Sequence, residues 1–83
     1  SLGDLAYVQN RYQEAVNSYQ QALPIFRRLG TRAAEASCLQ SIGLLALAEG
    51  RRDDAIPTLT EAARIYDVIG LPHQAEKTRS YLP

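Results

Sequence analysis

Residues 41–70 read SIGLLALAEGRRDDAIPTLTEAARIYDVIG, and residues 1–30 read SLGDLAYVQNRYQEAVNSYQQALPIFRRLG. Aligned at an offset of 40, the two stretches share nine identical residues, which in the first stretch are Ser1, Gly3, Leu5, Ala6, Arg11, Ala15, Ala22, Ile25 and Gly30. Five further pairs are conservative, and the offset continues more weakly to Leu82, which matches Ile42. Self-similarity at one fixed offset is typical of proteins built from stacked repeats.

Each repeat is predicted to contain two helices joined by a tight turn. Asn10 and Gly50 interrupt the helical periodicity inside the repeats, and Gly30 and Gly70 end them. Asn and Gly tolerate the left-handed backbone conformation that commonly follows a helix. We therefore predict helices over 2–9, 12–29, 32–49, 53–69 and 72–82, and no strand.

Two prolines fall inside predicted helices, where proline removes a hydrogen bond and costs about 3 kcal/mol. Pro24 and Pro57 both lie on the solvent side of their helical wheels, where water can hydrate the freed carbonyl. The sequence predicts a kinked but continuous helix at Pro24 and a first-turn perturbation at Pro57.

Composition excludes several classes of protein. The 83 residues carry nine Lys plus Arg and nine Asp plus Glu, and this balance argues against a nucleic-acid surface, which needs a cationic stripe. The chain has neither a signal peptide nor an apolar run long enough to span a membrane. The single Cys38 cannot form an intramolecular disulfide, which favours a reducing, cytoplasmic location.

The helix predicted over 32–49 has more apolar surface than one packing face requires. Two of its three faces are needed to pack against the helices before and after it. The third face remains for a binding groove and contains Ser37, Gln40, Leu44, Leu47 and Ala48. The helices over 12–29 and 53–69 each have one apolar stripe and are predicted to form the outer layer.

The repeated residues resemble the tetratricopeptide repeat, which has Leu-Gly, then Ala, an aromatic residue four positions later, and another Ala. The first copy has Leu2-Gly3, Ala15, Tyr19 and Ala22; the second has Ile42-Gly43, Ala55, Leu59 and Ala62. The period of this chain is 40 residues, whereas the ordinary tetratricopeptide repeat has 34. In its longer period the chain resembles the subclass found in kinesin light chains and bacterial signalling regulators. The resemblance covers essentially the whole chain.

The resemblance implies an all-α fold of helix-turn-helix hairpins, stacked as a short right-handed solenoid of about two repeats truncated at both ends. Residues 1–83 would form one module: 1–30 a partial first repeat, 31–70 a second repeat, and 71–83 the start of a third repeat or a capping helix. The residues expected to pack the repeats together are Gly3, Ala15, Tyr19, Ala22, Leu39, Ile42, Gly43, Ala55, Leu59, Ala62 and Tyr66.

The expected function is binding of a peptide or helix of another protein in a concave groove between the inner helices. The groove residues are predicted to be Asp4, Tyr7, Val8, Ser37, Gln40, Leu44, Leu47, Ala48 and Lys77. One subset of the family binds the acidic C-termini of chaperones and is similar to Gly-Asn at the repeat glycine. This chain has Asp4 and Leu44 after its two repeat glycines. An apolar, amphipathic segment is therefore favoured as the ligand over an acidic chaperone terminus.

Catalysis is not expected. His73 is predicted to be a surface or capping residue, Cys38 a buried inert thiol, and Asp53 and Asp54 acidic residues at a helix start. Neither a metal-ligand spacing nor a phosphate-binding glycine loop is present, and no cofactor is predicted.

Two further readings stay open. The segment could be a structural spacer or self-association element of a larger bacterial sensor-regulator, with no ligand of its own. The isolated chain is also expected to self-associate, because apolar residues around Tyr19, Phe26 and Leu29 at one end and around Ile65, Ile69 and Leu82 at the other would face water.

Overall fold

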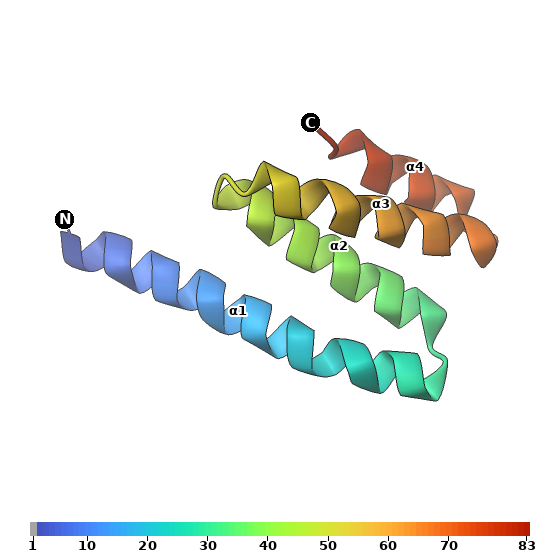
Figure 1. Ribbon diagram of the computed structural model, residues 1–83, viewed down its shortest axis with the longest axis horizontal. Coiled ribbons are helices and arrows are strands. Elements are labelled where there is room, and N and C mark those ends of the chain that lie inside the picture. Colours follow the sequence, from blue (N-terminus) through green and yellow to red (C-terminus); the bar gives the residue numbers. More distant parts are fainter. Residues whose placement is uncertain (1) are drawn as a thin grey trace.

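The computed structural model describes the backbone of residues 2–83 and the side chains of residues 9–83. Four helices follow one another: α1 (Leu2–Leu29), α2 (Arg32–Ala48), α3 (Arg52–Val68) and α4 (Pro72–Ser80). Each helix packs against the next, so α2 lies between α1 and α3, and α4 lies on α3 (Figure 1). The described residues contain no strand, which confirms the all-α prediction of stacked helical hairpins.

The three turns share one backbone geometry, which ends each helix at a glycine. Gly30, Gly50 and Gly70 have φ angles of 72°, 76° and 80°. After α2, the Arg51 amide donates to the Ala46 carbonyl at 2.8 Å and the Gly50 amide to Leu47 at 3.0 Å. The turns after α1 and α3 repeat this pair of bonds, which defines the Schellman motif. The predicted helix ends at Gly30, Gly50 and Gly70 are confirmed.

The turn predicted at Asn10 and Arg11 is wrong, because α1 runs unbroken from Leu2 to Leu29. Asn carries a Cβ and adopts the left-handed conformation less readily than Gly. No non-glycine residue among those described has a positive φ. At Asn10 the chain therefore keeps its helical hydrogen bonds where Gly50 breaks them.

Both prolines are accommodated inside helices. Pro24 is exposed within α1, whose helix continues through it, as predicted. Pro57 is exposed within α3, five residues after its first residue Arg52, so it lies in the second turn rather than the first.

The buried core lies on α2, α3 and α4. Its cluster consists of Ala36, Leu39, Ala62, Ile65, Tyr66 and Ala75, with Leu23 of α1 and Ile69 packed against it. The prediction that the Ile65 region faces water is wrong, because α4 covers this side of α3 and leaves Ile65 fully buried. Ile69 and Leu82 are half-buried.

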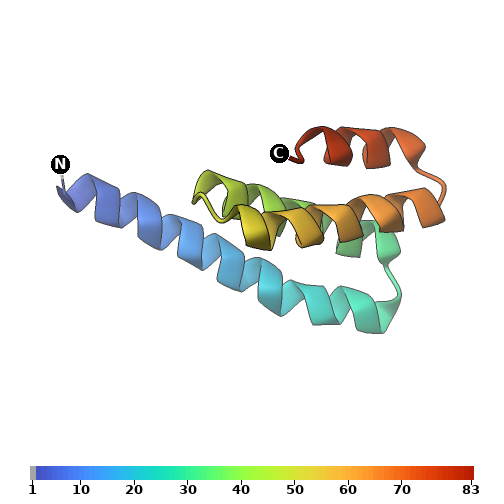
Figure 2. The same cartoon turned by 45° about the horizontal axis from the view of Figure 1, so that its top comes forward.

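The N-terminal part of α1 extends away from the stack. In Figures 1 and 2 the blue end of α1 projects past the ends of α2 and α3. The described chain is accordingly elongated, with extents of 45 × 28 × 18 Å. One end of the stack is thus a long helix with a neighbour on part of its length only.

Candidate interaction surface

The residues predicted to line the groove divide into three groups. Ser37, Ala48 and Lys77 are exposed, and Leu44 and Leu47 are half-buried. Asp4, Tyr7 and Val8 lie in α1, but their side chains are outside the part of the chain that the structure describes. The same holds for Gly3, one of the predicted packing residues. The described residues of the predicted groove therefore lie mainly on α2.

Gln40 contributes to packing between helices as well as to the predicted groove face. Its Oε1 lies 3.5 Å from the Tyr66 hydroxyl of α3 and 3.4 Å from the Thr78 hydroxyl of α4. Thr78 is fully buried and also donates to the Gln74 carbonyl at 2.8 Å. Gln40 thus joins three helices, because its long side chain reaches from the edge of α2 to hydroxyl groups on both neighbours.

Ala48 faces a cleft between α1 and the end of α2. This cleft has a volume of about 630 Å³ and is lined by Gln9, Asn10, Tyr12, Gln13, Ala48, Glu49 and Arg51. A second, mainly apolar hollow of about 420 Å³ lies beside it, lined by Arg11, Tyr12, Ala15 and Leu45. Sequence reasoning missed both, since a turn at Asn10 would have folded residues 2–9 back toward this region.

The predicted packing residues are placed differently in the two repeats. In α3, Ala55, Leu59 and Ala62 are fully buried and Tyr66 is 6% exposed. In α2, Leu39 and Gly43 are buried and Ile42 is half-buried. In α1, Ala15 and Ala22 are only half-buried, and Tyr19 is exposed at 37%. Tyr19, which was expected to pack the repeats together, lies outside the core, because α1 packs mainly against α2 whereas α3 is held between α2 and α4.

At Gly43, α2 lies directly against Leu59 of α3. A Cβ built on Gly43 would lie 2.6 Å from Cγ and 2.7 Å from Cδ2 of Leu59. Both distances are far below ordinary van der Waals contact. Only glycine fits this position without displacing Leu59.

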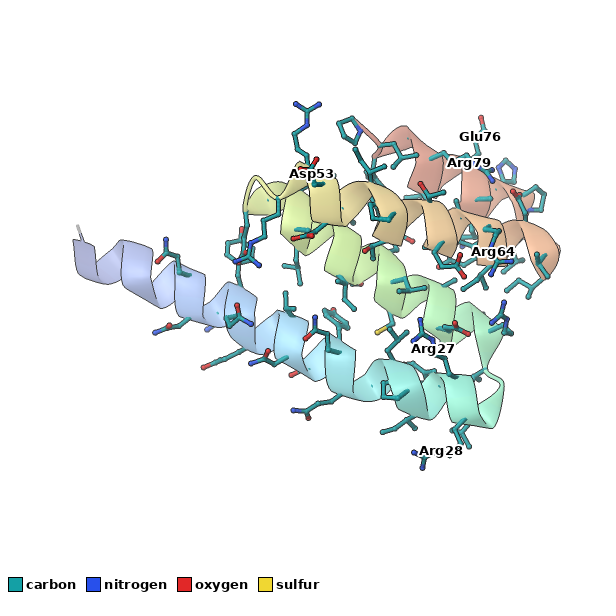
Figure 3. The ribbon with its side chains drawn as sticks, viewed as in Figure 1. Arg27, Arg28, Asp53, Arg64, Glu76 and Arg79 are labelled. Atoms are coloured by element: carbon teal, nitrogen blue, oxygen red, sulfur yellow. The ribbon has the colours of Figure 1, made fainter. Side chains whose placement is uncertain are left out.

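A charged cluster at the turn between α1 and α2 was not predicted. Glu35 is 3% exposed, and its carboxylate accepts from Arg27 Nε at 3.2 Å and from an Arg32 guanidinium nitrogen at 2.9 Å. Figure 3 shows Arg27 lying between α1 and α2, whereas Arg28 points away. Both arginines remain partly exposed, so the buried carboxylate is paired without burying its partners. An acidic residue on an otherwise apolar helix face was the signal available in the sequence.

Arg64 and Glu61 form a second pair on α3. Two guanidinium nitrogens of Arg64 lie 2.6 and 2.9 Å from the Glu61 carboxylate oxygens. The hydrogen bond from Arg64 lowers the pKa of Glu61, and the same bond raises the pKa of Arg64. This pair is largely exposed, which limits its contribution to stability.

The residues weighed for chemistry lie apart. His73 is exposed in the first turn of α4, and Asp53 and Asp54 are exposed in the first turn of α3. The Cys38 thiol is 3% exposed and donates to the Tyr19 carbonyl at 3.1 Å. Burial raises the pKa of this thiol, an effect that the Arg27 charge partly offsets.

Searches of the described part of the chain gave two further results. Its side chains include no group of three or more His, Cys, Asp or Glu residues placed to hold a metal ion. None of the described helices combines the length and the apolar character needed to cross a membrane.

The chain was compared with known proteins. It is 35% identical over 65 residues to the regulatory protein AfsR of Streptomyces griseus. This alignment covers 78% of the chain but only 7% of the length of that relative. No solved structure matches the chain. The sequence profile of the tetratricopeptide repeat matches residues 1–67, and together with the stacked hairpins this shows that the chain belongs to the tetratricopeptide repeat family.

Proposed function

We propose that this chain is a non-catalytic protein-interaction module whose α2 face binds an apolar, amphipathic segment of a partner protein. The observation that carries the proposal is the position of Leu44 and Leu47. Both remain partly exposed on a helix that already packs against α1 and α3. Tetratricopeptide repeats generally mediate protein–protein interaction, and their inner helices form the concave surface.

The chemistry of this face favours an apolar ligand. Two leucines and Ala48 are flanked by the neutral Ser37, with Lys77 exposed on α4. An amphipathic helix would bury its apolar side on the leucines and leave its polar side in water. An acidic chaperone terminus would find one lysine among the described groove residues.

Peptide selection on the 83-residue chain tests this proposal. Peptides selected from a random library would be measured by fluorescence anisotropy against the unmodified chain, Leu44→Asp and Ile56→Asp. Ile56 is a matched control because it is exposed at 42% on α3, outside the proposed groove. We expect Leu44→Asp to weaken binding at least tenfold and Ile56→Asp to leave it unchanged. Equal affinities for Leu44→Asp and the unmodified chain would rule out this groove.

A second candidate function is a self-association or spacer segment within a larger bacterial sensor-regulator. Two observations favour it: the similarity to a bacterial regulatory protein and the exposed apolar residues of α1, where Ile25 is 51% and Leu29 71% exposed. Exposed apolar patches of this kind promote association. A selection that yields no groove-binding peptide, together with a dimer in sedimentation equilibrium, would favour this function over peptide binding.

A further inference from the structure

The outer-layer helices α1 and α3 have matching apolar stripes, but these stripes are buried to different extents. Ala55, Leu59 and Ile65 of α3 are fully buried. Their counterparts 40 residues earlier are Ala15, which is half-buried, Tyr19 and Ile25, which are 37% and 51% exposed. The α3 stripe is buried between α2 and α4, whereas α1 packs mainly against α2. The described helices therefore leave the α1 stripe incompletely covered.

The second repeat shows what kind of helix fits such a stripe. There α2 approaches α3 so closely that a Cβ on Gly43 would lie 2.6 Å from Leu59. The chain contains an equivalent inner-helix segment in residues 2–9, here called the arm. The arm has Gly3 sixteen residues before Tyr19, just as Gly43 stands sixteen residues before Leu59. Its Leu5 and Ala6 also repeat in α2 as Leu45 and Ala46.

The arm cannot cover the stripe of its own chain while α1 is straight. Gly3 and Tyr19 belong to one helix, and sixteen residues at 1.5 Å each place them about 24 Å apart along its axis. Figures 1 and 2 show the arm projecting past α2 and α3, away from the rest of the described chain. In this conformation the arm does not reach the stripe of its own chain, whereas the arm of a second copy can.

Hollows adjoin the stripe where an inner helix would lie beside α2. The apolar hollow of about 420 Å³ is bounded by Tyr12 and Ala15 of α1 and Leu45 of α2. The cleft of about 630 Å³ extends from it to Ala48. A helix seated there would repeat the α2–α3 packing in the first repeat, with Gly3 against Tyr19 where the second repeat has Gly43 against Leu59.

We propose that two copies of this chain exchange their arms, so that residues 2–9 of each copy pack on the α1 stripe and beside α2 of the other. This is the mode of the self-association considered above, and it rests on that candidate function. Asn10 is the hinge. A straight helix at Asn10 gives the exchanged dimer, and a turn like that at Gly50 would give a closed monomer, as in domain swapping.

Substitution of the hinge tests the proposal by changing one residue far from any packing contact of the core. Asn10→Gly favours the turn, and Asn10→Ala favours the straight helix. The helix preference of Ala over Gly is worth about fivefold in each chain, so two chains shift the dimer dissociation constant by about 25-fold between the variants. Sedimentation equilibrium should show the Ala variant as the tighter dimer. Equal dissociation constants for the two variants would refute the proposal that Asn10 is the hinge of arm exchange.

A disulfide distinguishes arm exchange from other modes of pairing. Gly3→Cys and Tyr19→Cys would be combined with Cys38→Ala and oxidised. The close approach at Gly43, whose Cβ would lie 3.5 Å from the Leu59 backbone nitrogen, indicates that a bond can form at the equivalent pair. Arm exchange predicts a covalent dimer on a non-reducing gel, which neither single-cysteine variant forms in the same yield. Circular dichroism checks that all variants keep the same helix content.

The other outcomes reject the proposal in distinct ways. A disulfide within one chain shows the closed hairpin and overturns exchange. A dimer without the disulfide overturns exchange but leaves self-association in place. A monomer at all concentrations overturns both. None of these outcomes affects the test of peptide binding at Leu44, which uses a separate readout.

Discussion

Replacement of Gly43 by Ala tests the close approach of α2 to Leu59 of α3. The new Cβ would lie 2.6 and 2.7 Å from two carbons of Leu59, about 1 Å short of ordinary contact. Leu59 is fully buried between α2 and α3, so it cannot swing into water. Overpacking of this kind costs about 1 to 3 kcal/mol. The better helix propensity of Ala returns about 1 kcal/mol. We expect Gly43→Ala to destabilise by up to about 2 kcal/mol.

A double-mutant cycle with Leu59→Ala separates these two contributions. Leu59→Ala alone should cost about 2 to 5 kcal/mol, because it leaves a cavity in the core. In the Gly43→Ala background it should cost less, since it removes the atoms that clash and the new methyl fills part of the cavity. The propensity gain is the same in both backgrounds and cancels. The expected coupling energy is about 1 to 3 kcal/mol.

Urea unfolding followed by circular dichroism at 222 nm measures the free energy of unfolding of all four proteins. The comparison holds when the slope of this free energy against urea concentration is the same in each. The matched control pairs Gly43→Ala with Ile56→Ala. Like Leu59→Ala, this substitution removes three carbons from α3, but at an exposed position. That pair should be additive within about 0.5 kcal/mol. If the Leu59 pair is additive as well, α2 and α3 do not approach closely at Gly43, and the packing described here is wrong.

Three other substitutions probe separate features. Pro24→Ala should stabilise by about 2 kcal/mol in urea unfolding, since an interior proline costs about 3 kcal/mol and its rigidity in the unfolded chain offsets less than 1. Glu35→Ala should cost about 1 to 3 kcal/mol, and less when Arg27 and Arg32 are also replaced by Ala, because the buried carboxylate accepts from both. Burial raises the pKa of Cys38, so folding favours the neutral thiol: its contribution is complete below the ordinary thiol pKa of about 8.5 and is lost as pH rises above it. Thermal melts should therefore decline more steeply above pH 9 for the unmodified chain than for Cys38→Ala.

The fold was predictable wherever a single residue type determines the local backbone conformation. Glycines at 30, 50 and 70 are the residues best suited to the left-handed conformation that closes each Schellman motif, and all three helix ends followed from them. Asn10 occupies the corresponding position of the first repeat but carries no such preference. Whether its helix ends there depends on tertiary contacts of residues 2–9, which the local sequence does not encode.

The candidate surface was less predictable, because exposure depends on which neighbours are present. The repeat pattern assigned Tyr19 and Leu59 to one stripe, and they differ only in what covers them: Leu59 is enclosed and Tyr19 is not. Similarly, a helical wheel placed Gln40 on the free face of α2, and its side chain is long enough to reach α3 and α4 as well. Leu44 and Leu47 are half-buried in the structure, and their part in binding is a prediction for the peptide assay.

The two ends of the stack differ in a way that bears on where a partner would dock. At the α4 end, Glu76 and Arg79 stand where α2 has Ala36 and Leu39, which are core residues against α3. Arg79 is paired with Asp67 of α3. Covering these charges with another helix would remove them from water with little apolar gain. At the α1 end, the corresponding stripe is apolar and incompletely covered. The free energy available for association is therefore concentrated on α1 and the adjoining face of α2, so substitutions of Glu76 or Arg79 should leave both peptide binding and self-association largely unchanged.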